Sequence, residues 1–156
     1  MGCQECGADV PDAETCLDYF HALFAAEVDN DELRRMHGLT LLTYNLQHPS
    51  LSKPWYQLFG AEVMRRVFVR GENWSDALME THPRGVGRQQ ADAAVARLKT
   101  GGPSVMPDWV ITRPVPGELT VTCVDLASVE SQGDMVTAWA RSVAAHRYLG
   151  RERDQI

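Results

Sequence analysis

Residues 12–48 read DAETCLDYFHALFAAEVDNDELRRMHGLTLLTYNLQH, and this stretch decides the fold. Its apolar side chains recur at three- and four-residue spacing on both sides of an Asp29-Asn30-Asp31 turn, as in amphipathic helices. Asn and Asp at such a turn can cap the second helix, and acidic side chains suit its positive end. The sequence therefore predicts two helices, over 12–28 and 31–48, that form an antiparallel hairpin ended by Pro49.

The chain beyond this hairpin continues to favour helices. Pro54 opens a third helix over 54–70, since proline suits a first helical turn. A short helical piece can follow Asn73, and another helix over 86–99 is ended by two glycines. A closing helix is expected over 130–149. The fold class predicted is mainly α, a bundle of about five helices.

The stretch between the last two of these helices has a different character. Residues 109–124 hold two β-branched runs around a Pro-Val-Pro-Gly turn, which predicts a small β-hairpin. An extended loop is the alternative, because a lone hairpin is marginal unless it packs on helices. We expect a single domain over 1–156, made of a Cys knuckle (1–11), a helical part (12–100), an extended part (103–128) and the closing helix.

The composition excludes several classes of protein. The chain has 156 residues, of which 44% are hydrophobic, and such a length can bury a core without disulfides or metal. Its net charge of −6 argues against a nucleic-acid binder, which needs a basic face. It shows no secretory signal, and no apolar run approaches the roughly 18 residues that a membrane span needs. We expect a cytoplasmic protein that binds neither nucleic acid nor membranes.

The strongest chemical signal is Cys3-Gln-Glu-Cys6-Gly7. Two thiols three residues apart, followed by glycine, form the tight turn of a zinc knuckle, and reduced Cys-x-x-Cys pairs in the cytoplasm are more often metal ligands or redox groups than disulfides. A closed structural zinc site needs four ligands, usually Cys and His. In the predicted hairpin the numbers of facing residues add to about 59, which places Cys16 one turn from His48. The sequence therefore predicts a zinc site made of Cys3, Cys6, Cys16 and His48.

Other polar side chains of the hairpin leave alternatives open. His37 and His48 lie about 16 Å apart along a straight helix and cannot share one metal. His37 instead faces His21, so the two form either a hydrogen-bonded pair or, with Tyr44, a pocket for acid–base or hydrolytic chemistry. Tyr44 and Gln47 either support the metal ligands or line a pocket, because buried polar groups need partners. A redox dithiol is the main rival to a metal site, and Cys123 is expected to be a core residue.

Several of these segments together resemble an uncharacterised bacterial family, a domain of unknown function of about this length. The resemblance is carried by Cys3-Gln-Glu-Cys6-Gly7, by His37-Gly-Leu-Thr, by Tyr44-Asn-Leu-Gln-His48-Pro and by Trp139-Ala-Arg-Ser-Val. It implies that the first three cysteines, His37 and His48 belong to one pattern consistent with metal binding. It implies no activity.

The function expected from the sequence is binding of a protein partner or a small ligand, by a protein whose zinc is structural. An enzyme with a pocket around His21, His37 and Tyr44 is one alternative, and its catalytic residues stay unknown. A thiol redox sensor is the second alternative. A structural site is closed by four protein ligands, whereas a catalytic one has three and a water.

Overall fold

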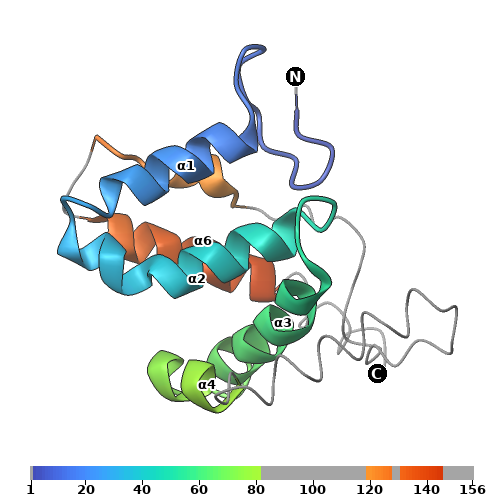
Figure 1. Cartoon of the computed structure of the whole chain (residues 1–156), viewed down its shortest axis with the longest axis vertical. Coiled ribbons are helices and arrows are strands. Elements are labelled where there is room, and N and C mark those ends of the chain that lie inside the picture. The colour runs from blue at the N-terminus through green and yellow to red at the C-terminus, as the bar shows by residue number, and fades with distance from the viewer. Residues whose placement is uncertain (1, 82–118, 128–130, 146–156) are drawn as a thin grey trace, which may run out of the picture.

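The computed structural model describes residues 2–81, 119–127 and 131–145, and over these ranges the protein is mainly helical (Figure 1). The helices are α1 (Cys16–Ala26), α2 (Asp31–Gln47), α3 (Pro54–Phe68), α4 (Trp74–Thr81) and α6 (Gln132–Ala144), with the short 3₁₀ helix η1 (Val121–Cys123) before α6. No strand occurs in these ranges, where Gly2 and Asp9 form an isolated antiparallel bridge. The prediction of a mainly α fold is confirmed.

The ends of the first two helices follow from their capping residues. Asn30 accepts hydrogen bonds from the amides of Glu32 and Leu33, so α2 begins where the sequence predicts. Helix α1 begins at Cys16, four residues later than expected. Thr15 is its N-cap: its hydroxyl accepts from the amide of Asp18, whose carboxylate accepts from the amide of Thr15. This capping box stabilises the helix start more than a first turn at Pro11-Asp12 would.

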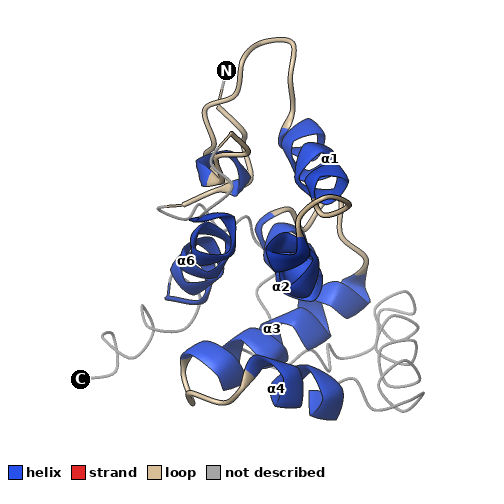
Figure 2. Ribbon diagram, turned by 90° about the vertical axis from the view of Figure 1, so that its left-hand side faces the viewer, coloured by secondary structure: helices blue, strands red, loops and turns tan. Residues whose placement is uncertain are grey.

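Helix α2 is the central element of the bundle. It packs extensively against α6 and α3, and α4 packs against α3, whereas α1 makes fewer contacts with α2 and also touches η1. Figure 2 shows α1 and the N-terminal loop on one side of α2, with α3 and α4 at the other end. The main core joins side chains of the knuckle, α1, α2, α3 and α6, and its fully buried members include Leu33, Leu46, Met64, Val136 and Trp139.

Two expectations about the C-terminal half are changed or fall outside the structure. The described part of the predicted hairpin, 119–124, consists of loop and the η1 turn. The prediction of a second strand there is therefore wrong, and the extended-loop alternative describes this part better. The expected helix over 86–99 lies outside the described residues. None of the described helices has the length and apolar character to cross a membrane.

Candidate metal centre

The N-terminal knuckle is a tight loop held by its own backbone. The amide of Cys3 donates to the carbonyl of Ala8 (2.8 Å), and the amide of Gly7 donates back to the carbonyl of Cys3 (2.9 Å). Gly7 has a φ of +77°, a left-handed conformation that glycine adopts without a steric penalty. The amide of Ala8 points at the sulfur of Cys6 (3.5 Å). The glycine after the second cysteine therefore turns the chain so that a backbone amide faces a thiol.

Two helix ends complete a four-residue cluster. Cys16 is the first residue of α1, and His48 is the C-cap of α2. The ligand atoms of Cys3, Cys6, Cys16 and His48 all lie within 4.8 Å of one another, and the sulfurs of Cys6 and Cys16 are 3.5 Å apart. The structure thus brings together the four side chains that the sequence analysis grouped.

The histidine of this cluster has its ring fixed for ligation. Nδ1 of His48 lies 3.0 Å from the carbonyl oxygen of Tyr44, a bond that requires the proton on Nδ1 and leaves a lone pair on Nε2. The ring stacks on that of Tyr44, with centroids 4.2 Å apart. His48 is 1% exposed, and its Nε2 has no hydrogen-bond partner within the described part of the chain. A buried nitrogen without a hydrogen-bond partner lowers the stability of the fold, and a metal ion bound to this lone pair would remove that cost.

Burial sets the protonation of the cluster. It raises the pKa of the Cys6 and Cys16 thiols above the ordinary cysteine value. Burial also acts to raise the pKa of Cys3, but hydrogen bonds from the backbone amides of Cys6 and Glu5 outweigh it, and the pKa of Cys3 is lowered. Burial lowers the pKa of His48, which keeps its imidazole neutral at pH 7. Binding of a metal ion would therefore displace protons from the buried thiols and none from the histidine.

The donor set fits zinc. Three thiolates and one neutral imidazole form a common structural zinc site, with Zn–S near 2.3 Å and Zn–N near 2.0–2.1 Å. Tetrahedral geometry with these bond lengths requires sulfurs about 3.8 Å apart. The 3.5 Å between the sulfurs of Cys6 and Cys16 is close to that value, and all four ligand atoms lie within 4.8 Å of one another, an upper limit about 1 Å longer. The cluster could hold a metal ion with only small side-chain shifts.

The comparison with protein families agrees with the resemblance inferred from the sequence. The model of a family described as a family of unknown function (DUF5946) matches residues 1–147. The chain belongs to this family. No curated protein and no solved structure matches the chain. The match to DUF5946 covers the knuckle, α1, α2 and α6, and it carries no activity with it.

The other polar residues singled out in the sequence have separate surroundings in this DUF5946 member. His21 is exposed, whereas His37 is half-exposed and its Nδ1 lies 2.6 Å from Oε2 of the buried Glu27. His37 therefore pairs with a carboxylate, and the expected His21–His37 hydrogen bond is replaced by this contact. Tyr44 is buried beside His48, two helical turns from His37, and its ring also stacks on Phe20.

Gln47 is hydrogen-bonded to α6 and to the loop before it, and is not a member of the metal cluster. Its Oε1 accepts from the indole of Trp139 (2.8 Å), and its Nε2 donates to the carbonyl of Leu119 (2.9 Å). Both bonds point toward α6 and the loop before it, so Gln47 links elements of the bundle. Sequence reasoning did not find Glu5, whose carboxylate accepts from the amide of Ser50 (2.9 Å) and so ties the knuckle to the loop after α2. An acidic residue between the two knuckle cysteines was the available signal.

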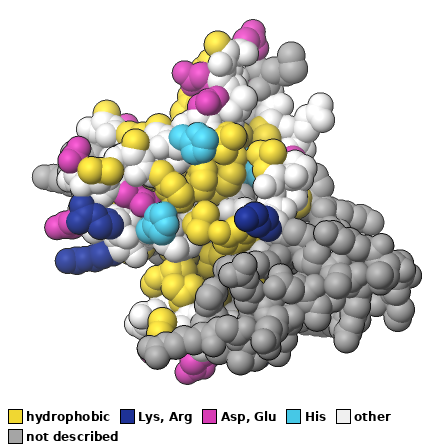
Figure 3. Space-filling model, viewed as in Figure 1, with side chains coloured by type: hydrophobic (Ala, Val, Ile, Leu, Met, Phe, Trp, Pro, Cys, Tyr) yellow, Lys and Arg dark blue, Asp and Glu magenta, His cyan; other side chains and the backbone are white. Residues whose placement is uncertain are grey.

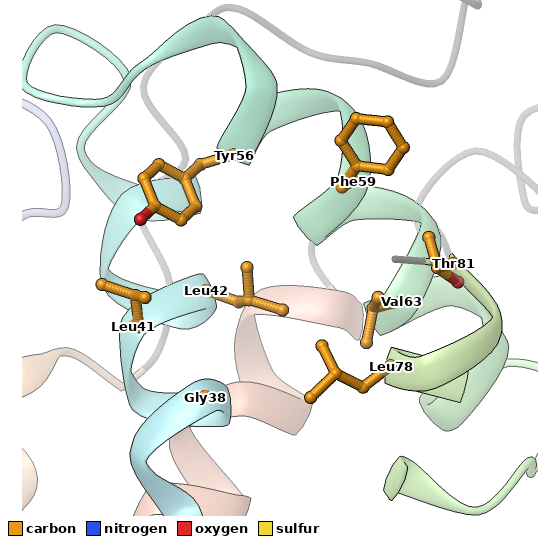
Figure 4. A pocket seen from close by; sticks show the side chains of 8 residues that line it. All are labelled: Gly38, Leu41, Leu42, Tyr56, Phe59, Val63, Leu78 and Thr81. Atoms are coloured by element: carbon orange, nitrogen blue, oxygen red, sulfur yellow. The ribbon is translucent and has the colours of Figure 1, made fainter. Parts of the chain in front are cut away.

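An apolar pocket lies away from the metal cluster, between α2, α3 and α4 (Figure 4). It is lined by Gly38, Leu41, Leu42, Tyr56, Phe59, Val63, Leu78 and Thr81. Figure 4 shows Leu42, Val63 and Leu78 pointing into the space between the helices. Hydrophobic side chains gather on the face of the molecule in Figure 3, over the middle of the bundle, and acidic ones at the end above α1. The pocket and the metal cluster are separate features of the fold.

Proposed function

We propose that this chain is a zinc-binding protein whose metal is structural, with Cys3, Cys6, Cys16 and His48 as the four ligands. The observation that supports this most strongly is Nε2 of His48. It is buried, it has no partner in the described residues, its tautomer is set by the Tyr44 carbonyl, and it lies within 4.8 Å of three sulfurs. A zinc ion would satisfy it and would allow the buried thiols to ionise.

The number and burial of the ligands support a structural role for the zinc. Four protein ligands close a tetrahedral site and leave no position for a substrate or a water. Cys6, Cys16 and His48 are buried, and Cys3 is partly buried. The ligands come from three segments: the knuckle, the start of α1 and the end of α2. The ion would therefore join the first residues of the chain to the bundle.

The role proposed for the folded protein is binding of a protein partner or a small ligand in the cytoplasm. The apolar pocket between α2, α3 and α4 supports binding, since ligand sites are concave and mostly apolar. The reducing cytoplasm would keep the three free thiols of the cluster available to a metal. An enzyme built on His21, His37 and Tyr44 has less support, because Tyr44 and His37 have different neighbours.

The proposal is tested by the metal content of the purified protein and of single variants. We expect one zinc per chain by mass spectrometry under native conditions, and a strong loss of zinc in Cys16→Ser and His48→Ala. His37→Ala and Cys123→Ser are matched controls outside the cluster and should retain zinc. Protein purified without chelator that contains no metal contradicts the proposal. Zinc that survives His48→Ala but is lost from His37→Ala contradicts the ligand set.

A further inference from the structure

The three thiols of the cluster differ in their access to solvent. Cys6 and Cys16 are 1% and 5% exposed, whereas Cys3 is only partly buried. All three sulfurs lie within 4.8 Å of one another, so each has another thiol near enough for a disulfide after modest movement. A small oxidant in solution therefore meets Cys3 first, with two buried thiols behind it.

The ligands are divided unequally between the parts that the site joins. Every thiol of the cluster lies on the knuckle or at the start of α1, and His48, the C-cap of α2, is the one ligand that comes from the α2 side. A disulfide between any two of the thiols stays within the knuckle–α1 unit, residues 2–26. It cannot replace the link to α2 that the metal makes through His48.

Apart from this link, the knuckle–α1 unit contacts the bundle through buried side chains of the main core, through η1 and through the hydrogen bond from the amide of Ser50 to Glu5. Helix α2 packs far more extensively against α6 and α3 than against α1. Between α1 and α2, Phe20 stacks on Tyr44 and Phe24 packs on His37, and Glu27, the C-cap of α1, contacts His37. The view in Figure 2 agrees, with α1 and the N-terminal loop at one end of the molecule. Loss of the metal would thus loosen this unit and leave α2, α3 and α6 packed together.

From these observations, and resting on the zinc site proposed above, we infer that hydroperoxides oxidise the thiols of the cluster and so release its zinc. The release breaks the link between the knuckle–α1 unit and the end of α2, and we call the cluster a clasp for this reason. The Cys3 thiolate attacks a peroxide oxygen: an S–O bond forms, the O–O bond breaks, and the alcohol or water leaves with a proton. The sulfenic acid on Cys3 is then attacked by the thiolate of Cys6 or Cys16. An S–S bond forms, the S–OH bond breaks, and hydroxide leaves and takes a proton from the solvent to become water. Two thiols lose two electrons, the peroxide gains them, and zinc is released because too few thiolates remain to hold it.

The released state differs from the zinc state in one region. His48 loses its ligand while its Nε2 stays buried without a partner, which favours opening of the contact between α2 and the knuckle. The knuckle–α1 unit then moves away from the end of α2 and uncovers the apolar side of α1 that carries Phe20 and Leu23. A thiol reductant and zinc together close the clasp again.

The experiment treats the zinc-loaded full chain with hydrogen peroxide and follows zinc release with a chromogenic chelator. A sulfenic-acid trap and peptide mass mapping identify the first cysteine oxidised, and hydrogen exchange follows α1 and α2. We expect zinc release in step with a disulfide among the site thiols, first labelling at Cys3, and faster exchange in residues 2–26 but not in α2. Cys123→Ser, which removes a partly buried thiol outside the cluster, should behave like the unmodified protein.

Different outcomes separate this inference from the proposed function. Absence of zinc from the purified protein overturns both. Stoichiometric zinc that persists at peroxide concentrations that oxidise Cys123 overturns the clasp alone. First labelling at Cys6, Cys16 or Cys123 also overturns it, and this mapping needs no variant that could fail to fold. Zinc release with unchanged hydrogen exchange in residues 2–26 refutes the movement of the knuckle–α1 unit away from the end of α2.

Discussion

One hydrogen-bonded relay connects α2, α6 and the loop before α6, and Gln47 is its centre. The Gln47 side chain accepts from the indole of Trp139 and donates to the carbonyl of Leu119. Gln47 and Trp139 are both 0% exposed. The relay therefore joins α2, α6 and the loop before α6, and its bond to Trp139 is buried away from bulk water. The change that tests it is Gln47→Ala.

The expected cost follows from what the alanine leaves behind. The indole N–H of Trp139 loses its acceptor in a buried site, which costs about 1–3 kcal/mol, and the side-chain volume lost adds a cavity cost of about 2 kcal/mol. We expect the free energy of unfolding to fall by about 3–5 kcal/mol. At roughly 2–4 °C per kcal/mol for a chain of this size, the melting temperature falls by about 6–20 °C.

The assay is thermal and urea unfolding of Gln47→Ala, Trp139→Phe and the double variant, each with its zinc affinity measured by chelator competition. The double-mutant cycle should give a coupling energy of about 0.5–1.5 kcal/mol between the two side chains. Zinc affinity should stay within about threefold of the unmodified protein, because the relay faces α6 and not the cluster. A stability change below about 0.5 kcal/mol, typical of a surface site, would refute the reasoning. So would a large loss of zinc affinity with unchanged stability, since that would make Gln47 a support of the metal.

Three further predictions concern the metal centre. Zinc at about one hundred times its Kd should raise the melting temperature by about 5–11 °C. His48→Ala should abolish this shift, and His37→Ala should retain it. A shift that survives in His48→Ala contradicts the ligand set. Because burial raises the pKa of two thiols, zinc binding should release at least two protons near pH 7, so that affinity falls as the pH drops. Calorimetry in buffers of different ionisation enthalpy measures this release, and no release counts against the site. Gly7 has a φ of +77°, and Gly7→Ala should weaken zinc binding about 5- to 30-fold. Gly71 has a φ of +72° with open space around it, and Gly71→Ala should lower stability alone. Equal zinc affinities for the two variants would contradict the role of the knuckle turn.

The helical skeleton was predictable because local chemistry fixes it. Asn30 caps α2 and Pro54 opens α3, and both signals act over a few residues. The start of α1 was missed although its signal is equally local. Thr15 and Asp18 form a capping box in which Asp occupies the N3 position of the helix, where Glu or Gln is more common. Pro11-Asp12 also offered a competing helix start.

The convergence of the four ligands was predictable because it depends on chain connectivity more than on register. The knuckle runs into α1 through a short loop, and α2 returns antiparallel, so Cys16 and His48 come to the same end of the hairpin. The register itself differs from the expected one. Phe20 faces Tyr44 and Glu27 faces His37, because an aromatic stack and a contact between the Glu27 carboxyl group and the His37 ring align the two helices.

Long-range partners were beyond the sequence. The side-chain amide group of Gln47 is hydrogen-bonded to Trp139 and Leu119, which lie more than seventy positions away in the sequence. No helical spacing encodes such a contact. The role of Glu27 was hidden for a different reason. It lies at the end of α1, where a solvated acid is common, yet it is buried against His37 because the return of α2 covers it.

X-ray absorption at the zinc edge of the purified chain tests the closed four-ligand site most directly, because it counts the ligands around the ion. The expected spectrum fits three sulfurs near 2.3 Å and one imidazole nitrogen near 2.0–2.1 Å, with no oxygen. In His48→Ala the nitrogen shell should disappear or zinc should be absent. A shell of two sulfurs or fewer, or one with oxygen ligands, would contradict a site closed by Cys3, Cys6, Cys16 and His48.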